Sequence, residues 1–289
     1  MMRALAEFIM RGRIQAVSIA LIGSWFPLLT QATLGLVTLR KGWQEGFLVT
    51  LWASLPVFLA IWVGDVGVAK VFAGVAVICV SYVVAGILRA TVSWSATLAA
   101  LVAFSMLSAL LVTLSVEDLA GELSAFYQKL MVSPDKQPSA EVLEILGSWT
   151  TKKASGVIAL WVGFTTVAGL FVARWWQAIL FNPGGFQSEF HSIRLTGALA
   201  LASGIAVAYC DFSGAEYQFW GGLFRLPLLV AGLGIAHCAI AKYKMNVAAV
   251  VILYIALFIF PPIGFILSLI GLTDAWLNYR KRFNLLPQP

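Results

Sequence analysis

Long uncharged apolar runs alternate with short charged segments along most of the chain. The run Met245–Thr273 lies between Lys242 and Lys244 on one side and Asp274 on the other, and it exceeds the ~20 helical residues that cross a bilayer core of ~30 Å. The predicted membrane segments are Ile14–Leu39, Gly46–Val63, Val71–Leu88, Val92–Val116, Ala154–Ala173, Leu195–Cys210, Gly221–Ala241 and Met245–Thr273. This pattern predicts an all-α, polytopic transmembrane helix bundle that forms a single domain over residues 1–289.

Prolines interrupt four of these segments, at Pro27, Pro56, Pro227 and Pro261-Pro262. A proline inside a helix removes a backbone donor and clashes with the preceding turn, so it kinks or breaks the helix. The segments around Pro27 and Pro261-Pro262 are therefore either kinked crossings or re-entrant hairpins, and the bundle has about six to eight spans. Segment length favours eight crossings, whereas the distribution of Lys and Arg favours six. Both alternatives place the two termini on one side of the membrane, which we expect to be cytoplasmic.

The one long polar stretch, residues 117–153, is predicted to be an insert of two short amphipathic helices between the fourth and fifth segments. The apolar face of the first is Leu119, Leu123, Phe126 and Leu130, and that of the second, which Ser139 caps, is Val142, Ile145, Leu146 and Trp149. Such helices lie on the bilayer surface or pack over the bundle, and a lid over a cavity is the alternative.

Small residues recur in the sixth segment, at every second position from Ala198 to Ala208. In lipid, small residues spaced four apart allow helix backbones to approach closely. We expect this helix in the middle of the bundle.

The composition of the 289-residue chain supports a membrane protein, with 61% hydrophobic and 11% charged residues, against about 45–50% and about 25% in soluble domains. The net charge of +6 is attributed to loops that face anionic lipid, because no basic stripe with stacking aromatics suggests nucleic acid. Cys79, Cys210 and Cys238 form no CxxC or Cys/His pattern, so no metal site and no cofactor are predicted.

Ionisable side chains within a span are candidate site residues, because their insertion costs about 2.5–3.5 kcal/mol. Arg225 lies in an aromatic, glycine-rich segment with Trp220, and it is the charge that we expect to face a cavity. His237 and Asp65 are the other candidates for binding a small molecule or lipid, although a packing role and an interfacial turn, respectively, also explain them.

Motifs of common hydrolases and metalloproteases, such as HExxH and GxSxG, do not occur in the chain, and the protein is predicted not to be an enzyme. One enzymatic alternative uses Glu189, His191 and Arg194, in a predicted loop after the turn Asn182-Pro183-Gly184-Gly185. A histidine and a carboxylate beside a lipid headgroup are able to do acid–base chemistry.

Phe260–Gly264, Gly271–Asp274 and Asn278–Arg280, together with Phe26-Pro27 and Leu39–Gly42, resemble the corresponding parts of the YybS-like family of bacterial multi-pass membrane proteins. That family is largely uncharacterised and is distantly similar to the S subunits of energy-coupling-factor transporters. Those subunits bind vitamins or metal ions in a bundle of six helices.

S subunits also dock on a coupling subunit through small residues on the first helix, and Ala16, Ala20 and Ser24 match that spacing. The extra apolar segments and the insert depart from the S-subunit pattern. No GxxxxGK[ST] loop is present, so another chain would have to supply any energy.

These observations predict a bacterial inner-membrane protein that binds a small molecule or lipid as a transport-related component. The alternative is a non-catalytic scaffold or assembly partner of an envelope complex. In both hypotheses the lipid bilayer is a partner, and a further membrane protein is a possible one.

Overall fold

The computed structural model describes residues 1–26, 28–63, 67–131 and 139–283, with the backbone alone at 61–63 and 141. All regular secondary structure in these residues is helical. The α-helices are α1 (Met2–Arg11), α2 (Arg13–Ile22), α3 (Leu29–Lys41), α4 (Trp43–Val63), α5 (Val68–Thr91), α6 (Trp94–Ser115), α7 (Leu119–Met131), α8 (Ala140–Gly147), α9 (Thr151–Phe181), α10 (Gly185–Ser192), α11 (Gly197–Phe212), α12 (Gln218–Lys242), α13 (Val247–Ile259), α14 (Pro261–Leu277) and α15 (Tyr279–Arg282), with short 3-10 turns η1 (Gly23–Trp25) and η2 (Ala215–Tyr217).

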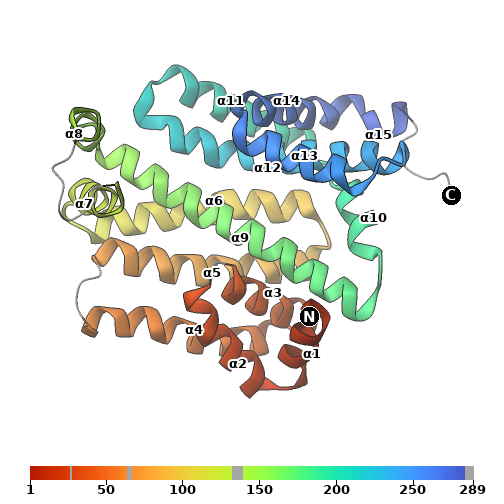
Figure 1. Ribbon diagram of the computed structural model, residues 1–289, viewed down its shortest axis with the longest axis horizontal. Helices are drawn as coiled ribbons and strands as arrows, with labels where there is room; N and C mark the ends of the chain where they lie inside the picture. The colour runs from red at the N-terminus through yellow and green to blue at the C-terminus, as the bar shows by residue number, and fades with distance from the viewer. Residues whose placement is uncertain (27, 64–66, 132–138, 284–289) are drawn as a thin grey trace.

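The long helices lie side by side along the longest axis of the molecule (Figure 1). Among the described residues, four helices are long and apolar enough to cross a membrane, and up to six spans result when each of two bent helix pairs counts as one. Many large apolar side chains on the outside of the bundle are exposed, as lipid-facing residues are. The predicted class, an all-helical multi-pass membrane protein, is confirmed.

Helix α9, with 31 residues, is the central element of the bundle and packs against α3, α5, α6 and α12. Its glycines are the points of closest approach, because a Cβ atom at Gly163 would lie 2.7 Å from Leu223 Cδ1 and one at Gly156 would lie 2.8 Å from Trp220 Cδ1. A buried hydrogen bond of 3.2 Å between the hydroxyls of Ser81 and Thr166 also links α5 to α9.

Helices α2 and α3 form an antiparallel pair at the N-terminus. The Thr30 hydroxyl in α3 donates to the Ala20 carbonyl in α2 at 2.9 Å. Arg13 at the start of α2 lies 2.5 Å from Glu45 in the first turn of α4, and α3 ends one residue before α4 begins. The pair therefore returns to the end of the bundle from which it starts, which favours the re-entrant interpretation of Ile14–Leu39. Pro27 itself lies outside the described residues.

The two bent pairs that count as possible spans are α10 with α11, at an angle of 67°, and α13 with α14, at an angle of 110° between Ile259 and Pro261. Pro261 occupies the first position of α14, where its missing N–H costs no helical hydrogen bond. Phe265 lies near Arg225 and Tyr279 near Ile235 and Cys238, so α14 runs in the same direction as α12 and back to the end at which α13 begins. When α2–α3 and α13–α14 are both counted as re-entrant, six elements are left to cross, namely α4, α5, α6, α9, α11 and α12. This set differs from the one chosen by length and hydropathy alone, which includes α13–α14 and leaves out α4.

Two expectations about individual segments are wrong. Pro56 and Pro227 do not break their helices, because α4 and α12 continue through them. Helix α11 lies at the edge of the bundle and not in its middle, since Ala198, Ala202 and Ala208 are exposed. The small residues of α11 allow close packing on one side only, against α12 and α14, while α3 takes a central position.

The predicted amphipathic insert is present as α7 and α8. The Glu122 carboxylate in α7 accepts a hydrogen bond of 3.0 Å from Ala69 N in the first turn of α5, where an acidic group is favoured by the helix dipole. Ser139 caps α8 as predicted, and the rings of Tyr127 and Trp149 pack 6.0 Å apart. We call this end of the bundle the α7 end and the opposite one the α10 end (Figure 1).

Helices α12 and α14 cross in direct backbone contact. A Cβ atom at Gly232 would overlap the Leu267 carbonyl oxygen, and one at Gly271 would overlap the Leu228 carbonyl oxygen. This contact anchors α14 to the bundle, because only glycine leaves room for backbones to approach so closely in lipid.

Substituting Gly232→Ala should therefore destabilise the protein by about 1–3 kcal/mol, the usual cost of overpacking. Thermal unfolding in detergent measures the effect. Gly264→Ala is the control in α14, because its Cβ would meet Leu257 Cδ1 at an ordinary 3.4 Å. Equal thermal midpoints for the two variants would contradict the close crossing.

Candidate functional site

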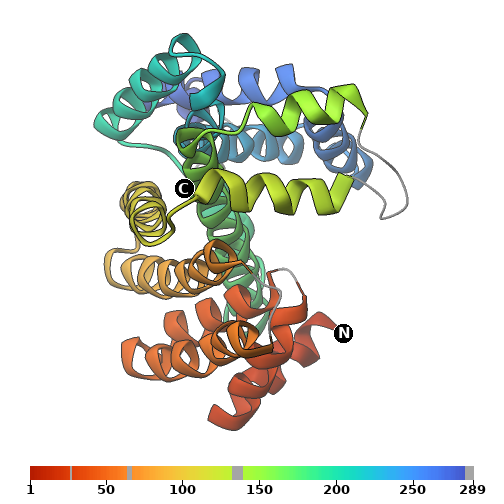
Figure 2. The same ribbon diagram turned by 90° about the vertical axis from the view of Figure 1, so that its left-hand side faces the viewer.

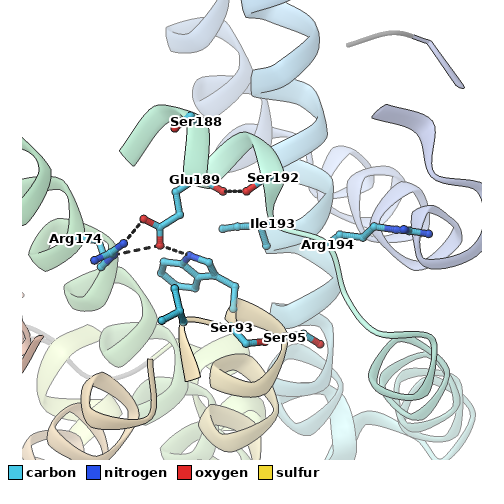
Figure 3. Close-up of a pocket in the computed structure, with 10 residues that line it drawn as sticks. Ser93, Ser95, Arg174, Ser188, Glu189, Ser192, Ile193 and Arg194 are labelled. Atoms are coloured by element: carbon cyan, nitrogen blue, oxygen red, sulfur yellow. Dashed lines mark hydrogen bonds and ion pairs between the residues drawn. The ribbon is translucent and has the colours of Figure 1, made fainter. Parts of the chain in front are cut away.

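A cavity of about 440 Å³ opens at the α10 end between the first turn of α6, the last part of α9 and α10 (Figure 3). The residues that line it are mostly polar. They are Val92, Ser93, Trp94, Ser95, Arg174, Ser188, Glu189, Ser192, Ile193 and Arg194.

An ion pair between Arg174 and Glu189 forms one wall of the cavity (Figure 3). Arg174 Nε donates to Glu189 Oε1 at 3.1 Å, and its Nη2 contacts the other carboxylate oxygen. Both side chains are 22% exposed, so the pair is largely shielded. Trp94 Nε1 donates to the same carboxylate at 2.7 Å, and its ring stacks on Phe171 at 4.9 Å. Side chains from two helices, α6 and α9, thus hold the α10 carboxylate in one position.

The start of α6 forms the opposite wall. Ser93 caps this helix by accepting a hydrogen bond from Ala96 N at 3.3 Å. Ser95 joins α6 to α11, because Thr196 N donates to its hydroxyl at 3.0 Å. The first turn of a helix carries partial positive charge from its free N–H groups. The cavity therefore presents a positive helix end, serine hydroxyls and a guanidinium–carboxylate pair.

Arg194 turns away from the ion pair toward α14 (Figure 3). Its Nε donates to the Asp274 carbonyl at 3.1 Å and its Nη2 to the Ala275 carbonyl at 2.8 Å. The Arg194 guanidinium is therefore used to bind carbonyls at the end of α14. Although Arg194 lines the cavity, its charged group is directed away from the ion pair.

A buried ion pair between Arg280 and Asp274 supports the cavity from behind, with side-chain exposures of 3% and 1%. Arg280 also donates to the carbonyls of His191 and Ile193, each at 2.6 Å. It thereby fixes the chain where α10 ends. This role of Arg280 was not predicted, because nothing in the sequence around the basic residues Arg280, Lys281 and Arg282 indicates these partners.

The structure does not gather the predicted ligand-binding residues into one site. Arg225 pairs with Asp211, with Nη2 and Oδ2 3.1 Å apart, and Trp220 Nε1 donates to the Lys152 carbonyl at 3.0 Å, both toward the α7 end. His237 contacts the Tyr254 hydroxyl at 3.1 Å, about 18 Å further along α12 at ~1.5 Å per residue. Arg225, Trp220 and His237 do not line the α10-end cavity. Asp65 lies outside the described residues.

The predicted docking residues lie on α2. Ala16 and Ala20 are buried, at 1% and 0% exposure, and α2 packs on α3 and α4. Ser24 is exposed and donates to the Leu21 carbonyl at 2.7 Å. The two alanines therefore pack against other helices of the same chain. Of the three predicted docking residues, only Ser24 is accessible to a partner protein.

Residues of the enzymatic alternative lie nearer to the cavity. Glu189 and Arg194 line it and His191 does not. The segment predicted as a loop is helix α10, started by Gly184, whose φ of 84° suits glycine. The turn signal Asn182-Pro183-Gly184-Gly185 was thus the sequence feature that pointed to this place.

The helices and the polar cavity define a multi-pass helical membrane protein with a candidate binding site at one end of its bundle. Comparisons with protein-family models, with curated proteins and with solved structures find no match. The resemblance to the YybS-like family and to S subunits stays a prediction.

Substituting Asp274→Asn should leave the Arg280 guanidinium buried with no counter-charge and destabilise the protein by about 3–5 kcal/mol. The double variant Asp274→Leu with Arg280→Met should be less destabilised, because it removes both charges. Urea or thermal unfolding checks both. Arg282→Met is the control, because Arg282 is exposed and lies in α15 together with Arg280. A loss of stability in this control as large as that of Asp274→Asn would argue against the buried pair.

Proposed function

We propose that this protein binds a lipid or another small amphiphile in the α10-end cavity, as a transport-related or lipid-handling component of a bacterial inner membrane. The observation that carries the proposal is the cavity itself, a polar space at the end of an apolar bundle. Polar groups and charges that converge within a membrane protein are costly and mark binding sites.

The chemistry of the walls favours a headgroup that carries both charges. Glu189 is able to accept hydrogen bonds from an ammonium group, while Arg174 and the first turn of α6 favour a phosphate or carboxylate. Because Arg174 and Glu189 already neutralise each other, a zwitterionic group matches this wall better than a simple anion does. The serine hydroxyls bind either part.

Binding fits the geometry better than catalysis. The Glu189 carboxylate is held by Trp94 and Arg174, and a carboxylate engaged in this way is a poor general base. No group of three or more His, Cys, Asp or Glu side chains able to hold a metal ion occurs in the part of the chain that the structure describes.

The distribution of basic residues supports a cytoplasmic α10 end. The basic residues at that end include Arg13, Arg40, Lys41, Arg89, Arg174, Arg194, Lys242, Lys244, Arg280, Lys281 and Arg282, whereas those toward the α7 end include Lys70, Lys129, Lys152, Lys153 and Arg225. Loops rich in Lys and Arg stay on the cytoplasmic side. The cavity would then open at the level of the inner leaflet, with both termini in the cytoplasm.

The scaffold alternative draws support from α13. This helix is entirely apolar apart from the Tyr254 hydroxyl, and none of its residues is buried. Such a face is available to another membrane protein as well as to lipid.

Filling the cavity tests the binding proposal. Native mass spectrometry with added phosphatidylethanolamine should show a lipid adduct, and Ser192→Trp should weaken it about tenfold, or ~1.4 kcal/mol. Gln187→Trp, an exposed position of α10 outside the lining, is the control and should bind as the parent does. Equal adducts in both variants would contradict binding in this cavity, and co-purified polypeptides with no lipid would favour the scaffold.

A further inference from the structure

The apolar face of α7 is covered at one end of the helix and open at the other. Leu119, Leu123, Phe126 and Leu130 share this face at helical spacing. Leu119 is 1% exposed and Leu123 packs against the core, but Phe126 is 49% and Leu130 is 66% exposed. The same face therefore begins on the bundle and continues beyond its edge.

Helices α7 and α8 lie across the ends of the spans. In Figure 1, where the spans run from left to right, both are seen end-on, and in Figure 2 they extend across the view. A helix at the end of a membrane bundle and perpendicular to its spans runs parallel to the bilayer plane. Because Leu119 faces the bundle from that position, the open part of the same face points toward the membrane and not toward water.

The charges around this helix fit the same placement. The Glu122–Ala69 hydrogen bond fixes α7 at the start of α5. The Lys70 amine lies 5.5 Å from the Phe126 ring centroid, so a cation sits beside the exposed ring, as is usual for an amphipathic helix at the headgroup level. Gln128, on the opposite side of α7, is exposed and polar.

From this geometry we infer that the overhanging half of α7 inserts Phe126 and Leu130 into the headgroup–acyl boundary of the bilayer. The occupant of this face is the lipid of the leaflet at the α7 end. An amphipathic helix buries its apolar face ~5–10 Å into that boundary, with cations at headgroup level. The insert then acts as a surface anchor beside the bundle, and its function is independent of the cavity at the α10 end.

Photocrosslinking tests the inference without cysteine replacement. A benzophenone amino acid is placed at Leu130 or, as the matched control, at Gln128, and the intact protein is irradiated in nanodiscs of phosphatidylethanolamine and phosphatidylglycerol. We expect adducts of lipid mass at position 130 in severalfold higher yield than at position 128. Phe126 is a second test position on the same face, in case the variant at Leu130 folds poorly.

Two outcomes would overturn the inference. Equal, low lipid yields at 126, 130 and 128 would mean that the face lies in water. A crosslink from position 130 to another part of the chain or to a second polypeptide would mean that α7 is a lid or a docking site.

Discussion

Close packing of neighbouring helices against the glycines of helix α9 is the constraint on which the rest of the bundle depends. In lipid there is little hydrophobic gain from bringing helices together, so association relies on packing and on small residues. Gly156 and Gly163 of α9 let α12 approach, and Gly169 receives the backbone and Cβ of Gln31 from α3. One long helix thus holds the re-entrant N-terminal pair and the C-terminal half of the chain, and its last part carries Arg174 to the cavity.

The second constraint is that charges inside the bundle must have partners. Arg280 with Asp274 and Arg174 with Glu189 satisfy this requirement, and each pair joins two consecutive helices. The first pair fixes the end of α10, and the second forms a wall of the cavity that α10 covers. Packing and site are therefore coupled, because the same short helix is held from behind and faces the cavity in front.

Much of this fold was predictable from apolar run length alone, because a span needs little besides an uncharged helix. The predicted segments Val71–Leu88 and Ala154–Ala173 lie inside α5 and α9, and each helix extends beyond its segment at both ends. Proline was a poor guide to helix breaks, because Pro56 and Pro227 sit inside continuous helices, while Pro261 starts one. Whether a proline-interrupted segment crosses the membrane or forms a re-entrant hairpin depends on contacts such as that between Thr30 and Ala20. No local sequence pattern indicates such contacts.

The candidate site was predictable only in part. The segment around Glu189 and Arg194 was recognised as a place for chemistry at a headgroup, from its turn and its charges. Arg225 appeared the stronger candidate because its partner, Asp211, is on the preceding helix, and the sequence does not reveal that the two pair. The role of Trp94 could not be seen, since an interfacial tryptophan is common at the end of any span.

In this topology the bundle has two re-entrant pairs, both entering from the α10 end. The topology is tested by reaction of single added cysteines at Glu7, Gln44, Lys244 and Lys281 with a membrane-impermeant maleimide, in vesicles of each orientation, with the parent protein as the blank. All four positions should react from the same side. Reaction of positions 7 and 44, or of positions 244 and 281, from opposite sides would contradict this topology and turn the corresponding pair into a full crossing.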